Sequence, residues 1–337
     1  MDDEIGNFVV IFRPPGDAPM YKVEVNTSQY TFVAAAAALA TKVLQTPQAI
    51  NAMIELALEL AETVAMRKSI QDNPALARQA VQLFVDKISA KFPGIVIDSS
   101  INTVQMLGFH LGIVWHGGLE DFDPRKHMIH INAQRLEDLM DVADAGTPMA
   151  DKYFQTFIFQ LANTFVHEVG GHLLVTFLSD LIVDENGQVA RPFTPPSVSY
   201  SNYALCDNCM AGESGRALED ILFGGSLEYY HDPSGGPRQP GIPYLLDEDN
   251  LVRCIPEAFI SNFLANQFQF PYPVEGPAFV PRTMIPLGNT TTPIQFPHPS
   301  ARPQLALQDL PNMAGDRVLL RRLRQVLTDR KRRAIAI

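Results

Sequence analysis

Two histidines five residues apart constrain this chain more than any other feature. In the stretch VHEVGGHLL, residues 166–174, the only polar side chains are those of His167, Glu168 and His172. At 3.6 residues per turn, five residues advance an α-helix by about 500°, so the two imidazoles would lie roughly 140° apart. A regular α-helix therefore cannot direct both side chains at one point.

An extra residue in one helical turn removes this conflict. Such a π-bulge lets residues five apart share a face, and π-bulges are frequent at functional sites. Gly170 and Gly171 lie between the histidines and tolerate the altered backbone. Two glycines in a helix cost roughly 2 kcal/mol relative to alanine, and a metal ion held by His167 and His172 would offset that cost. We predict a π-bulge near the end of a helix over residues 152–178.

A metal site also needs a third ligand from elsewhere in the chain. The segment GESGRALED, residues 212–220, supplies Glu213 on a separate predicted helix. The predicted ligands are therefore His167, His172 and Glu213, and the predicted metal is zinc. Three protein ligands leave a fourth position for water, whose pKa zinc lowers towards about 7. Glu168 is the predicted general base that activates this zinc-bound water.

Other residues are candidates for supporting roles around these ligands. A hydrolytic site usually has a donor that stabilises the oxyanion, and the candidates are Tyr203, Tyr230 and His231. Each of them is also an ordinary type of packing residue. Either Asp220 or Glu219 is expected to accept a hydrogen bond from a ligand histidine.

The pair Cys206 and Cys209, in CDNC, lies shortly before the third ligand. A single C-x-x-C is a weak metal signal. It is compatible with a disulfide that fastens the ligand loop, with a redox switch, or with two reduced buried thiols.

The two motifs together resemble dipeptidyl peptidase III. The zinc peptidases of that family have the expanded motif H-E-L-L-G-H, matched here by HEVGGH, and a later segment E-E-C-R-A-E, matched by GESGRALED. The resemblance implies that His167, His172 and Glu213 bind zinc and that Glu168 is the general base. It also implies a zincin-like core in which an extended substrate lies along a sheet edge, for which residues 127–132 are the candidate.

Three functions are compatible with these residues. The first is a zinc-dependent hydrolase of a peptide or amide bond, that is, a metallopeptidase-like enzyme. The second is a zinc enzyme of small-molecule metabolism that uses the same ligands and base. The third is a non-catalytic protein in which a chance grouping or a structural metal explains the motif.

The rest of the chain predicts an α+β fold, mainly helical, with a small mixed sheet around the motif helix and the third-ligand helix. Alternating residues predict strands at 8–12, 21–25, 94–98, 112–116 and 127–132. Thr46 and Asn73, each followed by proline, predict helix starts. The predicted units are 1–32 (strands), 33–92 (helical), 93–266 (zincin-like core), 267–303 (Pro-rich arm) and 304–337 (basic helix or tail).

Charge and hydropathy limit the partners. The net charge is −11, although residues 317–333 hold eight Lys and Arg against the single Asp329. An acidic body argues against nucleic acid as the main partner, and the expected substrate is a peptide or a small-molecule amide. The apolar stretch 32–40 is too short to span a membrane. Without a secretory signal in the first residues, we expect an intracellular, cytoplasmic protein, and the oligomeric state stays open.

Overall fold

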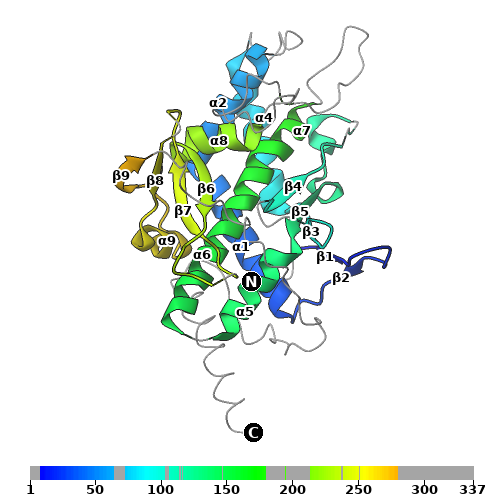
Figure 1. Cartoon of the computed structure of the whole chain (residues 1–337). Helices are drawn as coiled ribbons and strands as arrows, with labels where there is room; N and C mark the ends of the chain where they lie inside the picture. Colours follow the sequence, from blue (N-terminus) through cyan, green and yellow to red (C-terminus); the bar gives the residue numbers. More distant parts are fainter. Residues whose placement is uncertain are drawn as a thin grey trace.

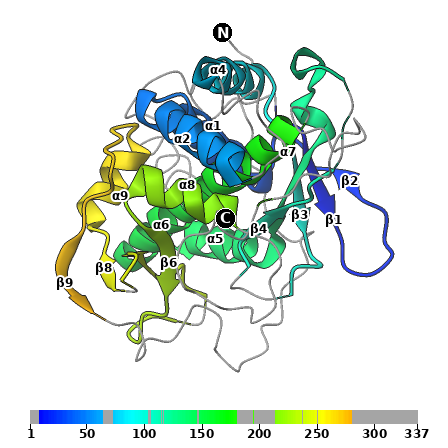
Figure 2. The same ribbon diagram turned by 90° about the horizontal axis from the view of Figure 1, so that it is seen from above.

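The structure, a computed structural model, places helices in the middle of the molecule and a sheet on either side (Figures 1 and 2). The residues that it describes are 8–63, 73–102, 106–113, 115, 117–145, 147–179, 194, 213–236, 238–249 and 251–279. The predicted α+β class is confirmed at this level.

The helices carry most of the described chain. They are α1 Ser28–Leu44, α2 Pro47–Thr63, α4 Pro74–Ala90, α5 Ala133–Ala145, α6 Pro148–Phe165, α7 Leu174–Leu178, α8 Ser214–Phe223 and α9 Glu257–Leu264. The predicted helix starts are correct, because α2 follows Thr46 and α4 follows Asn73. The hydroxyl of Thr46 accepts a hydrogen bond from the Ala49 amide, whereas Asn73 makes no such side-chain bond.

The first sheet has the strand order β2-β1-β3-β5-β4. Its strands are β1 Val10–Arg13, β2 Tyr21–Lys22, β3 Gly94–Asp98, β4 Gly108–His110 and β5 Met128–Asn132. The three central strands are parallel, and the two outer strands are antiparallel to their neighbours. Every residue of β3 is buried, as expected for a central parallel strand that is covered on both faces.

Two expectations about this region are wrong. The strand predicted at 112–116 is absent from the described residues 112, 113 and 115, and the chain pairs earlier, in β4. Because β4 lies outside β5, residues 127–132 are not the sheet edge. The strand β4 has only three residues and begins with glycine, which is too short to give a period-two pattern. Helix α5 follows β5 directly and was not expected.

The second sheet is an antiparallel meander in the order β6-β7-β8-β9. Its strands are β6 Ser226–Tyr230, β7 Ile242–Leu246, β8 Val252–Cys254 and β9 Glu275–Phe279. The last strand belongs to the predicted Pro-rich arm, 267–303, of which residues 280–303 lie outside the described part. The predicted basic helix, 304–337, lies there entirely.

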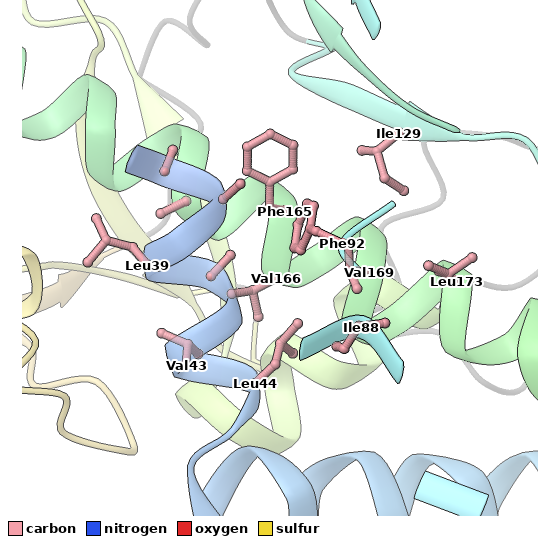
Figure 3. Packing of buried hydrophobic residues seen from close by; sticks show 14 of the residues in the cluster. Leu39, Val43, Leu44, Ile88, Phe92, Ile129, Phe165, Val166, Val169 and Leu173 are labelled. Atoms are coloured by element: carbon pink, nitrogen blue, oxygen red, sulfur yellow. The ribbon is translucent and has the colours of Figure 1, made fainter. Parts of the chain in front are cut away.

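A single large apolar cluster joins the helices and the first sheet. Figure 3 shows Val166, Val169 and Leu173 of the motif segment packed among side chains of α1, the end of α4 and β5. These three side chains are fully buried, so one face of the motif helix is fixed by the core. Among the described residues, no helix combines the length and the apolar character needed to cross a membrane.

Two neighbouring histidines, His110 at the end of β4 and the buried His127, have limited contact with solvent. The rings of His110 and His127 have centroids 6.0 Å apart, and His127 stacks on Phe122. Burial lowers the pKa of His110 to about 3 and that of His127 to about 4, while Asp123 opposes and Lys126 reinforces the shift in His127. Both side chains are therefore neutral at pH 7.

These histidines predict acid sensitivity. Since their folded-state pKa values lie below the usual value near 6.5, the folded protein binds fewer protons than the unfolded chain in this range. Their contribution to stability is present above about pH 6.5 and is lost as the pH falls towards 4. We expect His127→Gln to reduce this loss by up to about 1.4 kcal/mol per pH unit. Urea unfolding of the parent and the variant at several pH values between 7.5 and 4.5 measures this loss of stability. The same dependence of the unfolding free energy on pH in both proteins would contradict the prediction.

Candidate metal centre

The motif forms a π-helix over Val166–Leu173, labelled η3, between α6 and α7. The amide of Leu174 donates to the carbonyl of Val169, five residues earlier. The predicted π-bulge is therefore confirmed, and it extends over eight residues rather than a single turn. His167 and His172 consequently lie on one face, with ring centroids 5.3 Å apart.

The third predicted ligand meets both histidines. Glu213 Oε1 lies 2.5 Å from His172 Nε2 and 3.4 Å from His167 Nε2. One ligand atom from each of the three residues lies within 4.8 Å of the other two. The three side chains are between 20% and 31% exposed, so the group is partly open to solvent on one side.

Glu213 precedes α8 rather than lying within it. Its backbone is non-helical, and its Oε2 accepts a 2.6 Å hydrogen bond from the Arg216 amide, so it is the N-cap of that helix. One carboxylate oxygen thus satisfies the helix start, and the other faces the histidines. The cap bond holds the carboxylate in one orientation.

His167 is oriented by Glu219 from the far side of its ring. Its Nδ1 lies 2.8 Å from Glu219 Oε1, and a carboxylate can only accept, so the proton of this bond lies on Nδ1. Glu219 Oε2 accepts from the Leu227 amide at 2.9 Å and from the Ser226 hydroxyl at 3.1 Å. The Nε2 atom of His167 is thereby left for Glu213 or a metal.

The choice that the sequence left open between Glu219 and Asp220 is settled in favour of Glu219. Gly215 lies against the His167 ring, and Glu219 is four residues later on the same face of α8. Asp220 is turned by a further 100° and instead lies near Glu55 and Glu248, which together with burial raise its pKa.

His172 is oriented by a residue that the sequence did not single out. Its Nδ1 lies 3.1 Å from the hydroxyl oxygen of Ser214, which also accepts a 3.2 Å hydrogen bond from Thr194. Ser214 is fully buried. Its only sequence signal is its position directly after the third ligand.

Glycines allow the two helical segments to meet. A Cβ atom on Gly215 would lie 2.3 Å from His167 Nε2, and one on Gly171 would lie 2.5 Å from Gly215 Cα. A Cβ atom on Gly170 would lie 2.6 Å from a methyl group of Leu218. The paired glycines of the motif therefore permit close packing on α8 as well as the π-helical backbone.

Glu168, the predicted general base, is buried beside this group. It is 4% exposed, and its Oε2 atom is buried without a hydrogen-bond partner in the part of the chain that is described. Burial raises the pKa of Glu168, and the positive charge of His172 and His167 offsets this only in part. A carboxyl group with a raised pKa is suited to exchanging protons near neutral pH.

The pKa values of His167, His172 and Glu213 depend strongly on one another. Burial alone lowers the pKa of His167 and of His172, but the facing carboxylates, Glu213 above all, reverse the effect and raise both. Burial raises the pKa of Glu213, and the two histidines outweigh it and bring it well below its usual value. The carboxylates therefore favour the protonated form of the two histidines, and the histidines favour the ionised form of Glu213.

This donor set fits a zinc ion. Two imidazole nitrogens and one carboxylate oxygen are the ligands of many catalytic zinc sites. Tetrahedral bonds of about 2.0–2.1 Å separate ligand atoms by about 3.4 Å. His167 Nε2 and Glu213 Oε1 have this separation, whereas His172 Nε2 and Glu213 Oε1, 2.5 Å apart, would have to move apart to share a metal. Each histidine is held at its Nδ1 atom by a neighbouring side chain. Metal-binding histidines are usually oriented by such a hydrogen bond from the ring nitrogen that does not bind the metal.

The remaining candidates lie elsewhere or outside the described residues. Tyr230 packs with Tyr244, Leu246 and Val252 in a small cluster of the second sheet. His231 Nε2 lies 3.1 Å from the Gln239 amide nitrogen. Catalytic roles for these two residues stay predictions. Tyr203, Cys206 and Cys209 fall in the stretch 195–212, which is not described.

Comparison with known proteins yields no relative: no family model, no curated protein and no solved structure matches this chain.

The pairing of Glu219 with His167 predicts a selective loss of metal binding. Glu219→Gln replaces a charged acceptor with a weaker one, and such changes typically lower metal affinity 10- to 100-fold. Asp220→Asn is the matched control, since it changes the adjacent carboxyl on another face of α8 and should leave affinity unchanged. Competition titration with a zinc chelator measures both. Equal effects of the two substitutions would contradict the assigned role of Glu219.

The glycine contact predicts a second effect on the metal site. Gly215→Ala places a methyl group within the His167 ring, so the ring must leave its position. We expect metal affinity to fall at least about 10-fold, as when a partner that orients a ligand is lost. The control is Gly236→Ala, where a Cβ atom meets nothing within 4 Å. Metal binding by the Gly215 variant at the parent's affinity would show that the ring does not depend on this contact.

Proposed function

We propose that this protein is a zinc-dependent hydrolase that cleaves a peptide or amide bond. The observation that carries the proposal is the convergence of His167, His172 and Glu213 beside a buried glutamate. Among the described residues the group has three protein ligands, the number found in catalytic zinc sites, whereas structural sites have four. The partial exposure of the three side chains on one side is consistent with access for a substrate.

In this proposal each residue has a defined task. His167, His172 and Glu213 would hold the metal, and Glu219 and Ser214 would orient the two imidazoles. A bound zinc ion supplies Lewis-acid chemistry, which lowers the pKa of water and polarises a carbonyl group. Glu168 would accept the proton of the attacking water and deliver it to the leaving nitrogen.

The neighbourhood of the motif favours a peptide among possible substrates. The edge strand β4 packs against the π-helix, and the order of the sheet places no strand outside β4 among the described residues. The exposed apolar side chains Met106, Leu111 and Ile113 flank it. An open edge of this kind can bind an extended peptide by main-chain hydrogen bonds. In the zincin-like core that we propose, β4 therefore takes the place first assigned to residues 127–132.

The proposed role of Glu168 can be separated from metal binding. Glu168→Gln removes the base but none of the three ligands, so we expect a zinc content near one equivalent per chain and a fall in kcat of at least about 100-fold. Elemental analysis and digestion of a peptide library by the zinc-loaded protein measure the two quantities. Glu59→Gln, a glutamate on α2 outside the ligand group, is the control for a general effect of lost charge. Full activity of the Glu168 variant would exclude it as the base.

A further inference from the structure

A small cavity lies between α5, α6 and the first sheet. Its volume is about 20 Å³. Its walls are mainly apolar, and they include Leu107, Ile131, Arg135, Phe157, Gln160 and Thr164.

The cavity is aligned with the proposed base. Gln160 and Thr164 are four residues apart on one face of α6, and Glu168 follows Thr164 by four residues, just inside the π-helix. At 1.5 Å per residue, Thr164 lies about 6 Å from Glu168 along the axis. An extended peptide advances about 3.3 Å per residue. The cavity is therefore one to two substrate residues away from a bond held at Glu168.

The residue that precedes the edge strand lines the cavity. Leu107 directly precedes β4, and a Cβ atom on Gly108 would lie 2.9 Å from the methyl group of Thr164. The start of β4 therefore crosses α6 at Thr164 in close contact. A peptide that follows β4 passes the cavity at this point.

Arg135 is the charged residue of the cavity lining, beside the polar side chains of Asn132, Gln160 and Thr164. Arg135 donates to Asp138 at 3.1 Å, to Gln160 Oε1 at 3.2 Å and to the Gln239 carbonyl at 2.9 Å, and it lies 4.7 Å above the Phe157 ring. Its side chain is 8% exposed, and its Nε–H has no partner among the described residues. Because Asp138 balances the charge, the cavity offers a fixed donor without a net charge.

From these observations we propose that this cavity receives the side chain of the substrate residue next to the cleaved bond, and that it selects a small, uncharged side chain. This inference rests on the proposed function and specifies its substrate class. A volume of about 20 Å³ exceeds the 10–15 Å³ that a water molecule requires, so it admits a methyl or hydroxymethyl group. Alanine or serine fits at this position, whereas leucine and aspartate do not.

The test compares peptides that differ at one position, alanine, serine, leucine or aspartate, on either side of the cleaved bond. The zinc-loaded parent should prefer alanine and serine on one side. Leu161→Ala removes a half-buried wall residue and should raise kcat/KM for the leucine peptide relative to the alanine peptide by at least about 10-fold. Thr164→Ala, whose hydroxyl bonds only to its own helix among the contacts described, is a second enlarging variant. Leu83→Ala, a half-buried leucine of α4 away from the cavity, is the control and should keep the parent's ratio.

The possible failures are distinguishable. If the folded, zinc-loaded variants at both 161 and 164 keep the parent's leucine-to-alanine ratio, the cavity does not select the side chain, although the proposed function stands. If the parent prefers leucine or aspartate on both sides of the bond, the proposed role of the cavity in selecting a small side chain is likewise wrong. If the zinc-loaded parent cleaves no peptide, the proposed function fails and the cavity assignment fails with it.

Discussion

The contact between Gly171 of the π-helix and Gly215 of α8 brings the two halves of the candidate site together. A Cβ atom on Gly171 would lie 2.5 Å from Gly215 Cα. Because the atom it would meet belongs to the backbone, a side chain at Gly171 would force the two helices apart. Glu213 begins α8 two residues before this contact and therefore meets both histidines. Because the same carboxylate caps α8, the start of that helix and the geometry of the ligand group depend on one another.

The burial of the carboxylates around the two histidines is consistent with the proposed function. Glu168, Glu213 and Glu219 lie close to two histidines, and two of these carboxylates are almost fully buried. Burying ionised groups is costly unless they are paired or bind a metal. Glu219 is paired through three polar contacts, while one oxygen of Glu168 is not paired within the described residues. A retained buried carboxylate without a full set of partners is expected at a catalytic centre rather than in a core.

In the proposed function, the motif helix would connect substrate recognition to chemistry. Val166, Val169 and Leu173 anchor one face of it in the core, and the opposite side carries the ligands and the proposed base. Farther towards its N-terminus, Gln160 and Thr164 line the cavity beside the edge strand. A rigid helix of this kind sets the distance between the bond to be cleaved and the neighbouring side chain, and preorganisation of this sort supports both rate and specificity.

The sequence by itself determined the features that depend on local spacing. Five residues between His167 and His172 required a π-helical turn, proline after Thr46 and Asn73 marked two helix starts, and Glu213 was recognisable as a carboxylate near a helix start. Only the tertiary structure decided which residues support them. Glu219 rather than Asp220 orients His167 because Gly215 fixes which face of α8 meets the ring. Ser214, the three-residue edge strand β4 and the cavity at Arg135 arise from contacts between distant segments. Such contacts leave no periodic signal in the sequence, since each depends on where another part of the chain has folded.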